Sequence, residues 1–112
     1  MPTTHINMPY PSNIEGSVFD ATVYFRNSSD AAATPTTVHY RVDCLATGKE
    51  VTDWTSVTPG TSVTITLSTT HNAIEDKANM VEKKQLVVMS DKDLSTQTRD
   101  QAIWRVRNIE NI

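Results

Sequence analysis

The sequence contains one cysteine, few aromatic residues and no excess of positive charge, and each shortage excludes a class of protein. Cys44 is the only cysteine among the 112 residues, so the chain cannot form an internal disulfide and its core must hold together without one. Acidic residues outnumber Lys and Arg by 13 to 10, which gives a formal net charge of −3. A chain with that balance has no general basic field for phosphate, so we expect no nucleic-acid partner.

Long apolar runs and a leader segment are also missing. The first residues, Met1 to His5, provide neither the basic nor the apolar part of a secretory signal, and no stretch of the chain is apolar over the length of a bilayer. We therefore expect no membrane partner. Either a leader has been removed from the mature form, or the protein never used one.

The chain is rich in β-branched residues. Thr occurs 17 times and Val 11 times, whereas Leu occurs only four times. Branched side chains pack well on a pleated sheet and lose rotamer freedom in a helix, so this composition favours strands. The length suits one domain, which can bury about two-thirds of its unfolded surface without a disulfide or a metal.

Alternation of apolar and polar residues predicts where the strands lie and which side chains they bury. Six segments carry a strand signal: 18–26, 38–44, 51–54, 62–67, 85–90 and 102–107. The run 85–90 is apolar enough to be buried on both faces. The side chains predicted to share the core are Phe19, Ala21, Val23, Phe25, Val38, Tyr40, Val42, Cys44, Val63, Ile65, Leu67, Ala102, Trp104 and Val106.

The first sixteen residues depart from this pattern. Pro2, Pro9 and Pro11 disfavour helix, so residues 1–16 are predicted to form an extended N-terminal arm, with room for one short edge strand around Ile6. The β-sandwich domain then spans residues 17–112.

A second departure lies between residues 72 and 81. Asn72 followed by Glu75 resembles a helix N-cap pair, and Ile74, Ala78 and Val81 recur at helical spacing, which predicts a short helical turn. With six strands and a seventh at the N-terminus, the sequence predicts an all-β antiparallel sandwich of about seven strands. A closed barrel is the structural alternative.

Part of the chain resembles a known kind of domain. The run Thr36 to Asp43, followed by Trp54 and then by Ser62 to Leu67, resembles the middle strands of immunoglobulin-like and fibronectin III-like modules. Residues 22–74 with 101–108 are similar to small proteins encoded among the virion genes of tailed bacteriophages. The resemblance implies an Ig-like sandwich with a structural place on the phage head, tail or fibre.

The sequence also differs from the standard modules. One cysteine excludes the immunoglobulin cysteine pair, and no Tyr follows Tyr40, so the tyrosine corner is missing. Trp54 and Trp104 do not occupy the positions where these families keep a core Trp. The order of the strands in the sheets is therefore left open.

No combination of residues indicates a catalytic or metal site. His5, His39 and His71 are far apart in sequence, so no metal is expected. Asp91 and Asp93 begin like a calcium loop, but the Gly and the distal Glu of an EF-hand do not follow. The Ser and Thr residues lack a nucleophile motif, so a small hydrolase has no motif in its favour. We predict no enzyme and no cofactor.

Exposed cations and the two ends of the chain indicate a surface for partners. Arg105 and Arg107 project from one face of the last strand, and Lys83 and Lys84 open the strand before it. Pairing of these strands would create a basic stripe. It is either a solvated face, as most surface charge of this kind is, or a docking stripe for an acidic neighbour. The residues predicted to contact partners are Ile6, Met8, Tyr10, Arg105, Arg107, Ile109 and Ile112.

These observations favour a non-enzymatic structural component of a bacteriophage virion. It would be a capsid decoration, a head fibre, or a head–tail or tail accessory protein. Its expected partners are other virion proteins, such as capsid, connector or tail subunits, within a homo-oligomer or a symmetric assembly. The alternative is a carbohydrate- or receptor-binding module, for which Tyr24 and Trp54 are the candidate stacking platforms.

Overall fold

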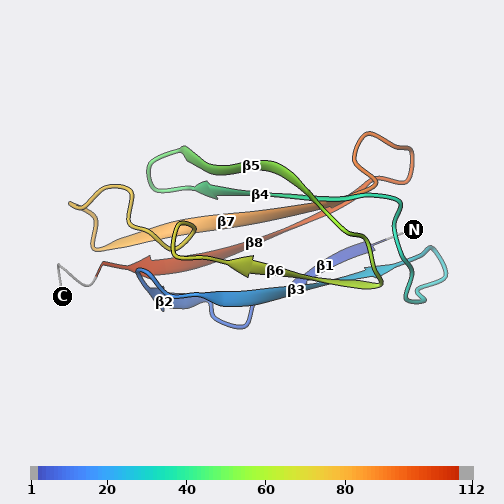
Figure 1. Cartoon of the computed structure of the whole chain (residues 1–112), viewed down its shortest axis with the longest axis horizontal. Helices are drawn as coiled ribbons and strands as arrows, with labels where there is room; N and C mark the ends of the chain where they lie inside the picture. Colours follow the sequence, from blue (N-terminus) through green and yellow to red (C-terminus); the bar gives the residue numbers. More distant parts are fainter. Residues whose placement is uncertain (1–2, 109–112) are drawn as a thin grey trace.

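Eight β-strands in two sheets form the structure, a computed structural model that describes residues 3–108 (Figure 1). The strands are β1 (Thr3–Asn7), β2 (Ser12–Ile14), β3 (Phe19–Arg26), β4 (Val38–Cys44), β5 (Lys49–Val57), β6 (Ser62–Leu67), β7 (Val81–Ser90) and β8 (Thr98–Arg107). One sheet has the order β1-β3-β6, and the other has the order β2-β8-β7-β4-β5. The predicted all-β, two-sheet architecture is confirmed.

Alternate side chains of both sheets meet in one core. β3 buries every second residue from Phe19 to Phe25, and β6 buries every second residue from Val63 to Leu67. All of the side chains predicted to point inward do so, with Tyr40 and Ala102 partly buried at the margin. Each fully buried Val or Leu contributes roughly 2 kcal/mol by leaving water, so this alternation is the main source of stability.

The N-terminal segment predicted as an arm lies extended along the sandwich. β1 pairs antiparallel with β3, from Thr3 opposite Arg26 to Asn7 opposite Thr22. β2 pairs parallel with β8 and adds an eighth strand. Alternation in the sequence could not reveal β2, because a strand of three residues is too short to show a period of two.

The helical turn predicted near residues 72–81 is wrong, because this segment forms a series of turns. The carboxylate of Glu82 accepts the N–H groups of Glu75 and Asp76 at 2.7 and 2.9 Å. Asp76 Oδ1 in turn accepts the N–H of Ala78 at 3.0 Å. Carboxylate oxygens thus satisfy backbone donors that would otherwise need helical partners, and these local bonds replace the helix.

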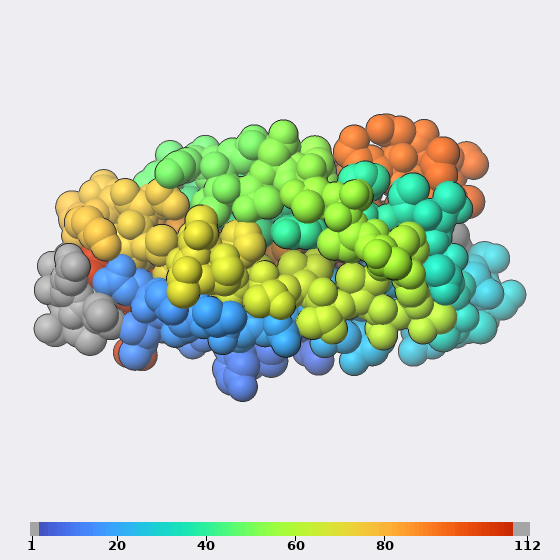
Figure 2. Space-filling model, viewed as in Figure 1, coloured from blue at the N-terminus to red at the C-terminus, as the bar shows by residue number. Residues whose placement is uncertain are grey.

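The loops gather at the two ends of the long axis, which measures 48 Å against 23 and 20 Å across. The β3–β4, β5–β6 and β7–β8 connections lie at one end, and the β4–β5 and β6–β7 connections lie at the other (Figure 1). In the space-filling view the β6–β7 loop, in yellow and gold, lies beside N-terminal residues in blue (Figure 2). Gly16 N–H donates to the Asn72 carbonyl at 3.0 Å and holds the two segments together.

Three hydroxyl groups join the two sheets along one side. Thr4 on β1 hydrogen bonds to Ser90 on β7 at 3.1 Å and to Thr98 on β8 at 2.6 Å, and Ser90 and Thr98 bond to each other at 2.6 Å. The N–H of Ile6 donates to Asp100 Oδ2 at 2.9 Å. The edge strand β1, whose backbone pairs with β3, is therefore tied to both sheets.

Replacement of Trp104 by Ala is expected to lower the free energy of unfolding by about 3–5 kcal/mol. The side chain is fully buried, and its Nε1–H donates to Asn72 Oδ1 at 2.7 Å, so the change leaves both a cavity and an unpaired acceptor. Urea unfolding measures the difference. The control is Ile103→Thr on the outer face, where we expect a change within about 0.5 kcal/mol. Equal stability of Trp104→Ala and the wild type would contradict the shared core.

Candidate interaction surface

Four cations occupy the outer face of β7 and β8 and are here called the basic flank: Lys83, Arg99, Arg105 and Arg107. β7 and β8 pair so that Lys83 lies opposite Arg105, and Val81 lies opposite Arg107. Trp104 and Val106 point inward, so alternation turns the two arginines outward. Within residues 3–108 these four side chains make no ion pair. The structure therefore brings together Lys83, Arg105 and Arg107 as the sequence suggests.

A shallow groove of about 350 Å³ adjoins this flank, and its lining combines apolar and cationic side chains. It is lined by Pro11, Ser12, Lys83, Ile103 and Arg105. The parallel strand β2 builds one wall, because Arg105 N–H donates to the carbonyl of Pro11 at 2.9 Å. Ile103 is about half exposed there. The groove thus presents positive charge beside an apolar patch.

Lys84, predicted for the same stripe, instead points into the core and is fully buried. Consecutive residues of a strand face opposite sides, so Lys83 and Lys84 cannot share one face. The register places Lys84 between Cys44 on β4 and Trp104 on β8, both fully buried. The prediction for Lys84 is therefore wrong.

The other predicted contact residues are divided between core and surface. Ile6 is buried between the sheets, and Met8 packs partly buried against the same core. Tyr10 is 56% exposed, and its ring meets Phe19 edge-to-face at a centroid distance of 5.7 Å. Ile109 and Ile112 lie outside the described residues.

Three carboxylates on the opposite side of the same outer face form what is here called the acidic flank: Asp43, Glu50 and Asp53. Arg41 lies among them and makes two hydrogen bonds to Asp43, at 2.7 and 3.0 Å. The hydrogen bond to Asp43 is the largest cause that raises the pKa of Arg41, with the charges of all three carboxylates adding to it against a smaller effect of burial. One cation among three anions leaves this flank negative.

Trp54 stands beside the acidic flank and already has cationic neighbours. Arg41 Cζ lies 5.9 Å and Lys92 Nζ lies 5.8 Å from the centre of its ring. Contacts of this kind stabilise the ring in place. Tyr24, on the outer face of the other sheet, is 45% exposed and has no aromatic neighbour among the described residues.

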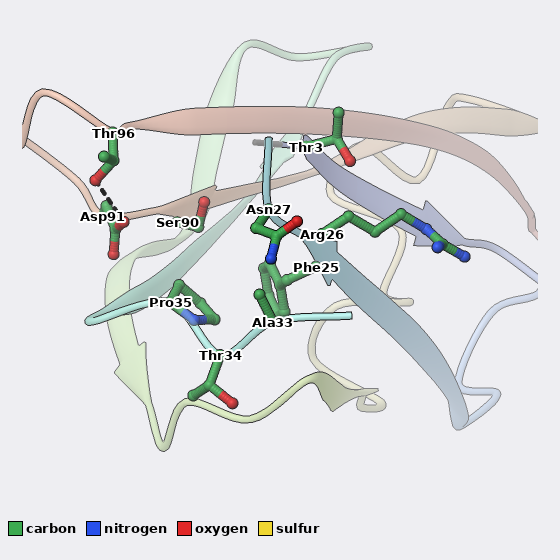
Figure 3. A pocket seen from close by; sticks show the side chains of 10 residues that line it. All are labelled: Thr3, Phe25, Arg26, Asn27, Ala33, Thr34, Pro35, Ser90, Asp91 and Thr96. Atoms are coloured by element: carbon green, nitrogen blue, oxygen red, sulfur yellow. Dashed lines mark hydrogen bonds between the residues drawn. The ribbon is translucent and has the colours of Figure 1, made fainter. Parts of the chain in front are cut away.

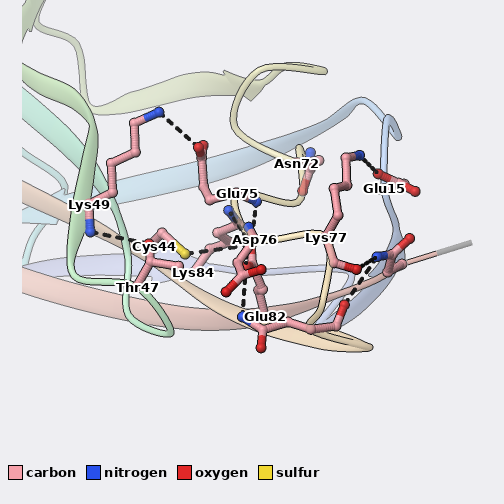
Figure 4. Close-up of polar contacts among 12 residues, drawn as sticks. Glu15, Cys44, Thr47, Lys49, Asn72, Glu75, Asp76, Lys77, Glu82 and Lys84 are labelled. Atoms are coloured by element: carbon pink, nitrogen blue, oxygen red, sulfur yellow. Dashed lines mark hydrogen bonds and ion pairs between the residues drawn. The ribbon is translucent and has the colours of Figure 1, made fainter. Parts of the chain in front are cut away.

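A buried ionic cluster closes the end of the sandwich where the β6–β7 loop lies (Figure 4). Glu82 is fully buried, and its Oε1 accepts Lys84 Nζ at 3.4 Å and Cys44 Sγ at 3.7 Å as well as the N–H of Glu75. Its Oε2 accepts Asn79 Nδ2 at 3.0 Å. Burial raises the pKa of Glu82, but these hydrogen bonds and the charge of Lys84 lower the pKa by more, so it lies below its ordinary value of 4.5. Glu82 is therefore an anion at neutral pH that fixes the loop.

His71 is the buried histidine of this loop, and its two ring nitrogens are both engaged. Nδ1 accepts the N–H of Ser68 at 3.0 Å, and Nε2 bonds to Thr52 Oγ1 at 2.9 Å. Ser68 Oγ is also 3.3 Å from Nδ1. Burial lowers the pKa of His71 below 6.5. Because Nδ1 is already an acceptor for the backbone, this Ser–His pair is a loop contact and does not present an activated nucleophile.

A second hollow, of about 190 Å³, opens at the opposite end between the β3–β4 and β7–β8 loops (Figure 3). Phe25, Ala33 and Pro35 form its apolar wall. Asp91 stands at its rim and accepts Thr96 Oγ1 at 2.6 Å and the N–H of Thr36 at 2.7 Å. These bonds outweigh burial and lower the pKa of Asp91. Its carboxylate is thus used to fix the two loops.

Residues 3–108 contain no group of three or more His, Cys, Asp or Glu side chains placed to hold a metal ion. They also contain no helix with the length and hydropathy needed to cross a membrane.

Sequence reasoning missed both the buried ion pair and the acidic flank. Every second residue of β7 from Glu82 through Lys84 and Leu86 to Val88 lies on the inner face of the strand. That period of two is the signal that would have placed the two charged residues inside. The acidic flank lies on β4 and β5, and the register in which these two strands pair is shifted by a bulge between Tyr40 and Asp43. An irregular register between strands has no counterpart in a sequence pattern.

No protein-family model matches the chain, and no curated protein or solved structure matches it either.

Removal of the Glu82 charge is expected to destabilise the protein more than removal of the Lys84 charge. Glu82→Gln faces an amide nitrogen toward backbone donors and leaves Lys84 unpaired, at a cost of about 3–5 kcal/mol. Lys84→Met leaves Glu82 with its three N–H donors, so the loss of unfolding free energy is smaller. Urea unfolding of both variants measures which one loses more unfolding free energy. A larger loss for Lys84→Met would contradict the role of Glu82 in fixing the β6–β7 loop.

The stabilisation by Glu82 is expected to depend on pH. Its pKa is lower in the folded protein than in the unfolded chain, so the contribution is complete above pH 4.5 and is lost as pH falls through the folded pKa. The difference in unfolding free energy between the wild type and Glu82→Gln should therefore shrink below pH 4.5. Asp91→Asn, at the other end, should behave in the same way, with a difference that shrinks below pH 3.8, because the pKa of its carboxylate is also lowered in the folded protein. A difference that grows in acid would show that the sign is wrong.

Proposed function

We propose that the chain is a non-enzymatic structural component of a bacteriophage virion that acts through protein–protein contacts. Its place would be that of a capsid decoration, a head fibre, or a head–tail or tail accessory protein assembled in the host cytoplasm. The observation that carries the proposal is the basic flank, which has no ion pair among the described residues and adjoins a groove containing Ile103. Unpaired cations beside an apolar patch suit the surface of an acidic protein neighbour.

The proposed identity of the sandwich is immunoglobulin-like. If β1, β3 and β6 correspond to strands A, B and E of that fold, then β8, β7 and β4 correspond to G, F and C of the second sheet. β5 lies beside β4 rather than beside β6, so it corresponds to a fourth strand that has changed sheets. The parallel strand β2 is an addition next to β8.

The assignment to a phage particle is supported by the resemblance of residues 22–74 and 101–108 to small proteins of tailed phages. The carbohydrate- or receptor-binding alternative draws less support. Trp54 is half-buried and has two cationic neighbours, and Tyr24 stands alone on its face. The two rings lie on different sheets, so together they do not form a platform on which a sugar chain could stack.

The double reversal Arg105→Glu/Arg107→Glu is expected to remove the chain from purified phage particles, because it replaces attraction to an acidic neighbour by repulsion. Quantitative mass spectrometry of gradient-purified particles measures the copy number against the major capsid protein. Arg26→Glu, on the outer end of β3, is the control and should leave the copy number unchanged. Absence of the wild-type chain from the particles would overturn the proposal.

A further inference from the structure

The β6–β7 loop begins with a tight turn that is closed by the side chain of His71. The ring folds back so that its Nδ1 accepts the backbone N–H of Ser68 at 3.0 Å. Its Nε2 lies 2.9 Å from Thr52 Oγ1 on β5, an edge strand of the five-stranded sheet. His71 is only 8% exposed, so water does not substitute for either bond. The ring therefore joins the loop to β5 through one hydrogen bond at each nitrogen.

These two bonds determine which nitrogen of His71 carries the proton. A backbone N–H can only donate, so Nδ1 must turn its lone pair toward Ser68. The proton of the neutral ring is then on Nε2, which donates it to Thr52 Oγ1. A second proton can enter only at Nδ1, where it would point at the N–H of Ser68. The protonated ring is thus incompatible with the closed turn.

The charged groups around His71 do not favour its protonation. The ionisable side chains on the elements near the ring are Lys49, Glu50 and Asp53 on β5, Cys44 on β4, Glu75, Asp76 and Lys77 in the loop, and Glu82 and Lys84 on β7. Within residues 3–108, none of the carboxylates lies within ion-pair distance of the ring. Glu75 is instead paired with Lys49 at 2.8 Å. Burial is therefore the cause that lowers the pKa of His71 below 6.5.

The residue after His71 connects the turn to the core. Asn72 is fully buried, and its N–H donates to the carbonyl of Ser68 in the same turn at 3.0 Å. Its side chain accepts the indole N–H of Trp104 at 2.7 Å and donates to the carbonyl of Ser17 at 2.9 Å. The turn that His71 closes thus positions the contact between the loop, the core and the segment that follows β2.

We propose that His71 makes this turn a switch that opens in mild acid. Protonation at Nδ1 replaces an acceptor by a donor, so the ring must move away from the N–H of Ser68. The hydroxyl of Ser68, 3.3 Å from Nδ1, can rotate to accept the new proton, but the backbone N–H cannot. The turn then loses its closing bond, and Asn72 is no longer held in place against Trp104. The proposal goes beyond the function above, because neither the basic flank nor a partner takes part.

The pH range of the switch follows from the direction of the pKa shift. The pKa of His71 is lower in the folded protein than its ordinary value of 6.5 in the unfolded chain. The unfolded chain therefore binds more protons in mild acid. The contribution of the turn is complete above pH 6.5 and is lost as pH falls toward the folded pKa. Glu82 begins to lose its contribution only below pH 4.5, so the two responses are separate.

Amide hydrogen exchange on the full chain tests the switch. The N–H groups of Ser68 and Asn72 should exchange at least about tenfold faster at about pH 5.5 than at about pH 7.5, after correction for the intrinsic rate, because each depends on a bond of the closed turn. In His71→Asn the side-chain oxygen can accept the N–H of Ser68 but does not titrate, so this difference should disappear. His5→Gln and His39→Gln are the matched controls and should keep it.

Two further measurements use the ring and the core directly. The 15N shifts of the ring of wild-type His71 should show a neutral form with its proton on Nε2 above pH 6.5. The fluorescence of Trp104, isolated by Trp54→Phe, should change over the same pH range as the amide exchange, because its indole N–H loses the Asn72 acceptor. Neither measurement requires a substitution at His71.

Three results would overturn the switch. These are a proton on Nδ1 of His71 at neutral pH, a Ser68 N–H whose corrected exchange rate is the same at both pH values, and a His71→Asn variant that responds to acid like the wild type. The proposed function is tested separately, by the copy number of Arg105→Glu/Arg107→Glu in particles. Failure of one proposal therefore leaves the other standing.

Discussion

A single buried carboxylate holds one end of this molecule in place. Glu82 stands on the inner face of β7 and accepts two backbone N–H groups from the β6–β7 loop, the amide of Asn79 and the ammonium of Lys84. The loop fixed in this way also carries Asn72, whose side chain accepts the indole N–H of Trp104 and donates to three backbone carbonyls, including that of Ser17. The anion therefore determines where the loop lies over the core. Without it, the fully buried ammonium group of Lys84 would face apolar neighbours unpaired.

β7 shows how one strand can carry two unrelated tasks. Its inner positions include the ion pair and the apolar residues Leu86 and Val88, and its outer positions begin with Val81 and Lys83. The period of two assigns adjacent lysines to opposite environments, since Lys84 is sealed in the core and Lys83 faces the groove. A change at Lys83 thus alters the surface with little effect on the core. A change at Lys84 does the reverse.

The sequence was sufficient for the layers of the fold and insufficient for its details. Alternation predicted the inward side chains of β3, β4, β6 and β8, because a half-buried strand leaves its period in the sequence. It failed at residues 72–81, where helical spacing was outweighed by a carboxylate that takes up the backbone donors. It found Arg105 and Arg107 but not their separation from the acidic flank, because the distance between β8 and β4 depends on strand order, which alternation does not encode.

Three of the four sheet edges within residues 3–108 are short, charged or occupied. β5 is a free edge of nine residues, and Lys49, Glu50 and Asp53 place charges along it, which opposes pairing with another strand. β2, the other edge of the same sheet, has only three residues. β1 is tied to β7 and β8 by the hydroxyl contacts of Thr4. The fourth edge is β6, which has six residues and pairs along its backbone with β3 alone among the described strands, so it is the edge left open to a partner strand.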